Sequence, residues 1–199
     1  MQEEARASLT SPTDPHTGPA AAPAVGRSRL SAIVLLWTVL TFVADQGTKI
    51  WALKALEPGQ PRPLIGDWIQ LNLIRNSGAA FSLGNTMTWL LTLLSIAIIV
   101  GVVVTARRVA TWAWAVTLGL LLGGALGNLL DRMVREPAFF RGHVVDFIDY
   151  FGWFIGNVAD IAIVVAAGLV ILLTLRGIPA TNQASTSQAP RAQTGSTDE

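Results

Sequence analysis

The sequence predicts a mainly α-helical membrane protein with four transmembrane helices, and three observations lead to that prediction. The chain has 199 residues, of which 51% are hydrophobic and only 14% charged, and its mean hydropathy is +0.49. Four apolar stretches each approach the ~20 residues that a helix needs to cross a bilayer. Polar tails rich in alanine and proline enclose those stretches. One membrane-embedded domain is therefore expected.

The two ends of the chain differ in composition from the middle. Residues 1–26 are rich in Ala, Pro, Ser and Thr, and residues 177–199 have a similar composition with Gln. Such segments cannot bury enough apolar surface to fold, so both are predicted to be disordered tails. The folded domain is expected to cover residues 27–176.

The four predicted spans run from about Leu30 to Leu53, Met87 to Ala106, Val109 to Leu130 and Asn157 to Leu175. Two arginines precede the first span, as in a signal peptide, but no small-residue cleavage site follows it, so the span is expected to be retained. Arginines before this span and in the short loop at 107–108 place both termini in the cytoplasm by the positive-inside rule.

Two longer segments separate the spans on the opposite, extracytoplasmic side. The loop 54–86 opens with turn residues, and then residues 68–73 alternate with period two. That pattern predicts a strand, and hence a small extracytoplasmic β-sheet, a cradle beside the helices. Residues 131–156 become rich in aromatic side chains toward their end, which predicts an interfacial helix or loop between spans three and four.

Composition excludes several classes of site. There is no cysteine, which excludes disulfides, thiolate nucleophiles and cysteine-based metal sites. The only histidines are His16 and His143, too few for a multi-histidine metal site. We therefore expect no metal and no cofactor. A formal net charge of +1 supplies no basic field for nucleic acid.

Two acidic residues stand out at the start of the last span. Asp160 begins the apolar run up to Leu175, and a charge at membrane depth costs about 2.5–3.5 kcal/mol. Asp146 precedes it in a segment that can fold back. If the two carboxylates approach each other they will share one proton, so one can accept a proton from water while the other polarises a carbonyl. Alternatively, Asn157 is a helix N-cap and Asp160 completes a capping box, without catalysis.

Two further polar clusters have both structural and functional interpretations. Asp45 and Lys49 are four residues apart in the first span, where they can form an ion pair. Asn76 and Gly78 follow the predicted strand. They form either a plain turn or a place where the glycine lets a substrate backbone approach closely.

The remaining cluster closes the third span. Asn128, Asp131 and Arg132 are spaced to share one helix face. An Asp131–Arg132 ion pair is the simplest structural interpretation, and the arginine is also favourable at a helix C-terminus.

Taken together and in order, these motifs resemble signal peptidase II, the bacterial lipoprotein signal peptidase family. The motifs are Asp45-Gln46-x-x-Lys49, Asn76-x-Gly78-Ala79-Ala80-Phe81, Gly127-Asn128-x-x-Asp131-Arg132, Val144-Val145-Asp146-Phe147 and Asn157-x-Ala159-Asp160. The resemblance covers about residues 30–176. It implies an intramembrane aspartic endopeptidase that removes the signal peptide from prolipoproteins, cutting before a cysteine that carries a diacylglyceryl group.

The resemblance also implies roles for individual residues. Asp146 and Asp160 match the catalytic dyad. The positions that match substrate-binding or supporting residues are Asp45, Lys49, Asn76, Gly78, Asn128, Asp131, Arg132 and Asn157. The expected location is the bacterial cytoplasmic membrane, with the site near the extracytoplasmic face and 131–156 as a gating loop. The expected partners are prolipoproteins and membrane lipids, and the protein is expected to be a monomer.

Two other classes of function stay open on the residues alone. A small transporter could use intramembrane acids as a proton relay. A membrane scaffold could use the same acids only as caps and ion pairs. Losing either aspartate would then alter transport or stability rather than cleavage.

Overall fold

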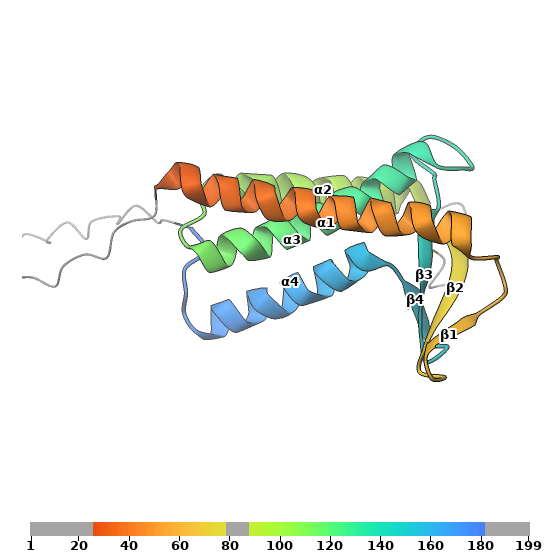
Figure 1. The fold of residues 1–199 in the computed structure, drawn as a ribbon. Coiled ribbons are helices and arrows are strands. Elements are labelled where there is room, and N and C mark those ends of the chain that lie inside the picture. Colours follow the sequence, from red (N-terminus) through yellow and green to blue (C-terminus); the bar gives the residue numbers. More distant parts are fainter. Residues whose placement is uncertain (1–25, 79–87, 182–199) are drawn as a thin grey trace, which may run out of the picture.

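The computed structural model describes residues 26–78 and 88–181, which form four helices and four strands. In chain order the elements are α1 (Arg27–Ala55), β1 (Arg62–Ile65), β2 (Ile69–Asn76), α2 (Thr88–Ala106), α3 (Trp112–Val134), β3 (Val144–Tyr150), β4 (Phe154–Gly156) and α4 (Val158–Leu175). All four helices are long and apolar enough to cross a membrane. They run side by side, and the sheet lies across one end of the bundle (Figure 1).

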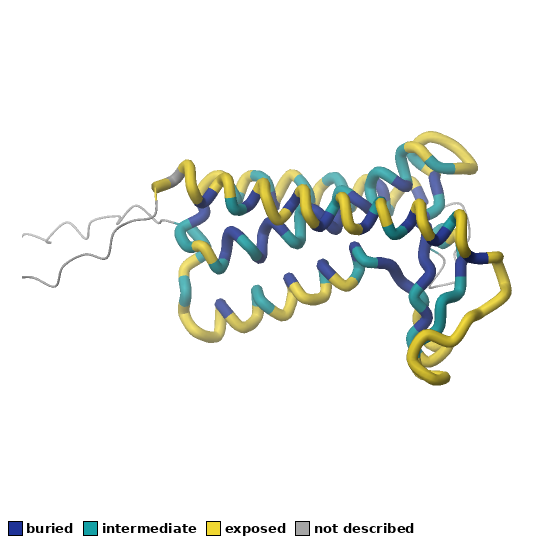
Figure 2. Tube along the Cα trace, viewed as in Figure 1, coloured by how far each residue is buried: buried dark blue, intermediate teal, exposed yellow. Residues whose placement is uncertain are grey.

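Helix α3 is the centre of the bundle. In its most apolar 18-residue window 56% of the residues are buried, against 11–28% in the other three helices, and Figure 2 shows the same contrast. Gly119 and Gly123 let α1 approach: a Cβ would lie 2.8 Å from the carbonyl oxygen of Val34 at the first position and 2.6 Å from that of Thr38 at the second. Small residues spaced by four allow membrane helices to pack closely without a hydrophobic driving force.

The sheet is antiparallel with strand order β1-β2-β3-β4. Side chains at the end of α1 and just after it fix the sheet to the bundle: Ala52 and Leu56 pack with Leu73 and Val145 in a buried cluster. The start of α1 and the end of α4 lie at the opposite end of the bundle from the sheet (Figure 1).

The strand predicted from the alternating residues 68–73 is confirmed as part of β2. Its register on β3 shifts between Leu71 and Ile74, so that Ile74 pairs with Asp146 and Asn76 with Val144. A bulge of this kind bends a strand and re-aims its side chains. The bulge determines which residues at the end of β2 face β3. There the side chain of Asn76 contacts Asp146 on β3.

The predicted fold class is confirmed, but the segment between spans three and four differs from the prediction. Residues 131–134 are the last turn of α3, and residues 144–150 and 154–156 form strands rather than an interfacial helix. The reason is local, because Val144, Val145, Phe147 and Ile148 are β-branched or aromatic residues that favour a pleated, half-buried surface.

The folded part of the chain also extends beyond the predicted boundary at residue 176. The backbone N–H of Ala110 donates to the carbonyl of Ala180 at 3.0 Å, and the indole of Trp114 donates to the carbonyl of Ile178 at 2.9 Å. Residues 177–181 therefore close the α2–α3 turn. The remainder of both predicted tails, and residues 79–87 of the first loop, lie outside the described residues.

Candidate functional site

Polar side chains from α1, α3, β2, β3 and the start of α4 meet where the bundle joins the sheet. They are Asp45, Lys49, Asn76, Asn128, Asp131, Arg132, Asp146, Asn157 and Asp160. All nine come from the clusters that the sequence singled out. The structure therefore unites motifs that are more than a hundred residues apart in the chain.

Lys49 is the centre of a buried ion cluster. Its ammonium lies 2.9 Å from Asp45 Oδ2, 2.8 Å from Asp131 Oδ2 and 2.9 Å from Asn128 Oδ1, which uses all three of its donors. The side chains of Lys49, Asp45 and Asp131 are completely buried. Arg135 donates to Asp131 Oδ1 at 2.6 Å, so two acids and two bases balance.

The predicted Asp45–Lys49 pair is thus confirmed, whereas the predicted Asp131–Arg132 pair is wrong. Asp131 is turned toward Lys49 and Arg135. Arg132 donates instead to the carbonyl of Asn128 at 3.1 Å. Side chains of neighbouring helix residues point about 100° apart. The carboxylate of Asp131 therefore cannot point into the bundle interior and also pair with the side chain of the next residue.

The acids of the buried ion cluster also bind backbone N–H groups next to Asp146 and Asp160. Asp131 Oδ2 accepts from the N–H of Val145 at 3.2 Å, and Asp45 Oδ1 accepts from the N–H of Ala159 at 3.0 Å. Val145 and Ala159 immediately precede Asp146 and Asp160. Buried carboxylates on α1 and α3 thereby fix the positions from which the two acids project.

Asn157 joins the two acids directly. Its side-chain amide donates to Asp146 Oδ1 at 2.6 Å, and its backbone N–H donates to Asp160 Oδ2 at 3.0 Å. Its Oδ1 accepts from the N–H of Asp160 at 3.1 Å, which completes the predicted capping box. A backbone N–H can only donate, so the orientation of this amide is settled.

Asn128 links the ion cluster to Asp160. Its Oδ1 accepts from the ammonium of Lys49, which has no lone pair, and this leaves its amide to donate to Asp160 Oδ1 at 2.9 Å. Each oxygen of Asp160 therefore accepts one strong donor. The charge of Arg132 also acts on both Asp146 and Asp160.

Asn76 supplies the remaining donor to Asp146. Its amide lies 2.8 Å from Asp146 Oδ2, and its Oδ1 accepts from the N–H of Gly78 at 2.8 Å. Gly78 has φ +89°, and a Cβ there would collide with the side chain of Leu91. Glycine is needed at this turn for its backbone conformation and for space against α2.

Asp146 is 2% exposed, and its environment alters its acidity. The pKa of its carboxyl is raised from 3.8 to about 6, chiefly by burial and to a lesser extent by the nearby charge of Asp160, while the hydrogen bonds from Asn76 and Asn157 act in the opposite direction. A larger share of this carboxyl is thus protonated at mildly acidic pH than in an exposed aspartate.

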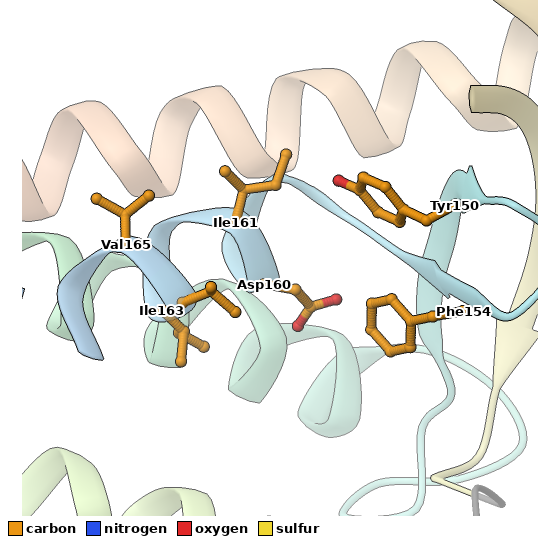
Figure 3. Close-up of a pocket in the computed structure, with 7 residues that line it drawn as sticks. Tyr150, Phe154, Asp160, Ile161, Ile163 and Val165 are labelled. Carbon is orange, nitrogen blue, oxygen red and sulfur yellow. The ribbon is translucent and has the colours of Figure 1, made fainter. Parts of the chain in front are cut away.

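An apolar cavity of about 520 Å³ adjoins Asp160. Figure 3 shows Asp160 between the rings of Tyr150 and Phe154 from the β3–β4 hairpin and the aliphatic side chains of α4. Burial, and secondarily the charge of Asp160, raises the pKa of the Tyr150 hydroxyl. Val164, which also lines the cavity, is 70% exposed, so the cavity opens on the lipid-facing side of α4.

Sequence reasoning missed three contributors to this site. Tyr150 and Phe154 are paired across the hairpin, a register that the aromatic spacing alone did not reveal. Gln46 lay inside a recognised motif but was given no role, and its amide donates to Asp45 at 3.0 Å and to the carbonyl of Gly127 at 3.1 Å. Within the described residues, no three acidic or histidine side chains are grouped to hold a metal ion.

Comparisons with known proteins agree on one family. A family model for signal peptidase (SPase) II matches residues 37–176. A lipoprotein signal peptidase of Rhodococcus jostii (strain RHA1) is 47% identical over 165 residues, which are 83% of this chain and 82% of that protein. Another, from Mycobacterium avium (strain 104), is 48% identical over 145 residues, 72% of this chain and 80% of its own.

Solved structures support the same relationship at the level of the fold. One, described as "Bacterial membrane enzyme structure by the in meso method at 2.3 A resolution", has a TM-score of 0.63 and 30% sequence identity. The match covers 73% of this chain and 88% of that one. A second bacterial membrane enzyme, at 1.9 Å, also gives a TM-score of 0.63, with 27% identity.

Proposed function

This chain belongs to the signal peptidase II family, and we propose that it is an aspartic endopeptidase with Asp146 and Asp160 as its catalytic pair. Its substrates are diacylglyceryl-modified prolipoproteins, and it cuts before the lipidated cysteine. One observation carries the mechanism: Asn157 donates to both carboxylates, at 2.6 Å and 3.0 Å. Both acids are therefore held against the same residue, and in the proposed mechanism one of them is protonated and the other ionised.

The surroundings of each acid support a division of roles. Asp146 is more deeply buried and has a pKa near 6, so it retains the shared proton and donates a hydrogen bond to the scissile carbonyl. Asp160 lines the cavity and accepts from Asn128 and from the backbone N–H of Asn157, so it lies where a water and a substrate in the cavity can reach it. Asp160 takes a proton from the attacking water and later returns it to the leaving amine.

The cavity supports a lipid-bearing substrate. Its wall beyond Asp160 is aliphatic and aromatic, and its volume of about 520 Å³ lies in the range typical of ligand sites. Because it opens toward lipid, a diacylglyceryl group can reach it without leaving the bilayer. This arrangement fits an enzyme of the bacterial cytoplasmic membrane whose termini are cytoplasmic and whose site lies near the extracytoplasmic face.

The test uses the purified full chain in lipid nanodiscs with a synthetic diacylglyceryl-modified prolipopeptide, and mass spectrometry of the products. Asp146→Asn and Asp160→Asn are expected to keep the fold and to lose cleavage by at least a thousandfold. The matched control is Asp149→Asn, because Asp149 is also a buried acid of β3 but contacts Asn72 and Gly152 rather than the site. It is expected to cleave normally.

Normal cleavage by both site variants would overturn the proposal. A transporter would instead show pH-driven uptake into liposomes without cleavage. A scaffold would show altered thermal stability in the variants and no cleavage by the wild type.

A further inference from the structure

The tip of the sheet carries a group of exposed aromatic and aliphatic side chains that the proposed mechanism does not use. We call this group the aromatic tip; its members are Leu64, Ile65, Trp68, Phe151 and Trp153. Its members come from the end of β1 and the turn that follows it, and from the turn between β3 and β4. The ring of Phe151 lies 5.8 Å from that of Trp68 and 6.5 Å from that of Trp153, so the rings form one continuous surface.

The large side chains of the aromatic tip are mostly exposed rather than packed in the core. Trp153 is 93% exposed and Trp68 is 68% exposed. Asp67 is the one charged residue within these two turns. A contiguous exposed apolar patch of this kind is typical of an interaction site.

The axes of the four spanning helices indicate the direction of the membrane normal. The depth of the aromatic tip can be inferred relative to them. Figure 1 shows the sheet crossing the bundle at the level of the last turns of α1 and continuing sideways past α4. Trp51 near the end of α1 and Trp89 at the start of α2 are both about half exposed at this same end of the bundle. Tryptophans at helix ends lie at the level of the lipid headgroups.

We propose that the aromatic tip inserts into the interface of the lipid leaflet at the sheet end of the bundle. The partner is the surface of the surrounding bilayer. Tryptophan and phenylalanine suit this depth because their rings are largely apolar and the indole N–H can still reach headgroups. The sheet is then held at both ends, by α1 at one end and by lipid at the other.

This placement has a consequence for the cavity beside Asp160. Tyr150 and Phe154, which form one wall of the cavity, belong to the hairpin whose turn carries Phe151 and Trp153. When the turn lies in the headgroup layer, the cavity mouth faces the acyl chains of the same leaflet. This consequence rests on the proposed function, whereas the depth of the tip does not.

The experiment exploits the absence of cysteine from the chain. Trp153→Cys creates a single site for a nitroxide spin label, and its depth in nanodiscs is measured from the relative accessibility to oxygen and to a water-soluble nickel chelate. Gln60→Cys, in the exposed loop after α1, is the aqueous reference. Leu94→Cys, exposed on α2, is the hydrocarbon reference.

The label at 153 is expected to be shielded from the nickel chelate at least fivefold relative to position 60, and to lie shallower than position 94. Equal nickel accessibility at 153 and 60 would overturn the proposal. So would dipolar broadening at 153 that disappears on dilution with unlabelled protein, because a second copy of the chain would then cover the tip. The depth is read without any cleavage assay, so its failure is separate from failure of the proposed peptidase.

As a second readout, Trp153→Glu is expected to raise KM for the lipidated peptide severalfold in nanodiscs with kcat unchanged, and Trp153→Phe to restore it. An unchanged KM for the glutamate variant would count against insertion of this side chain.

Discussion

Replacing Lys49 with methionine tests whether the buried ion cluster holds the site together. Methionine has a similar length but no charge, so Asp45 and Asp131 would face each other in a fully buried space with only Arg135 to compensate them. Breaking a buried pair by removing one partner costs about 3–5 kcal/mol. For a chain of this size that corresponds to a fall in Tm of roughly 6–20 °C.

Thermal unfolding in detergent, followed by circular dichroism, measures this loss. Lys54→Met is the matched control, because Lys54 lies on the same helix but is exposed, and its Tm is expected to change by less than about 2 °C. Cleavage is expected to fall in the Lys49 variant even below its Tm, since Asn128 loses the donor that aims its amide at Asp160. A Lys49→Met protein with the wild-type Tm and activity would refute the account of the cluster.

Three further predictions concern acidity and backbone packing. The pKa of Asp146 is raised from 3.8 to about 6 in the fold, so its proton contributes about 3 kcal/mol of stability that is lost as pH rises through that window. Urea or SDS unfolding at several pH values is expected to show this slope, and Asp146→Asn to remove it. Gly127→Ala places a Cβ against a buried carboxylate and is expected to cost about 1–3 kcal/mol. Gly47→Ala, where a Cβ meets nothing within 4 Å, is expected to be neutral or stabilising. Thermal unfolding of the two variants measures the difference. Gly78→Ala combines positive φ with a steric collision and is expected to reduce cleavage more than tenfold. Gly59→Ala has a similar φ without the collision; equal effects of the two in a kinetic assay would remove the steric argument.

The features that the sequence predicted well are those with a local physical signature. Apolar length identified the four spans, with boundaries that differ from the structure by a few residues. The i,i+4 spacing of Asp45 and Lys49 predicted their ion pair, and the Asn157–Asp160 spacing predicted the capping box. Each of these interactions is made within one helix, so spacing alone specifies it.

The features that the sequence did not predict depend on contacts between helices and strands. The preference of Asp131 for Lys49 over Arg132 depends on how α1 rotates against α3, and no local pattern encodes that rotation. The strands β3 and β4 need β2 as a partner, so the strand conformation of this aromatic-rich segment could not be predicted from its own residues. The roles of Tyr150 and Phe154 required the hairpin register.

The ion pair within α1 also bears on how the protein enters the bilayer. Asp45 and Lys49 lie one turn apart on the same helix and 2.9 Å from each other, so each neutralises the other before any later helix is synthesised. The stretch 30–53 of the first helix can thus enter lipid as a nearly neutral segment, although it contains two charged residues. When α3 follows, Asp131 and Asn128 complete the coordination of Lys49. The residues that later support the acids first serve to make their own helix insertable.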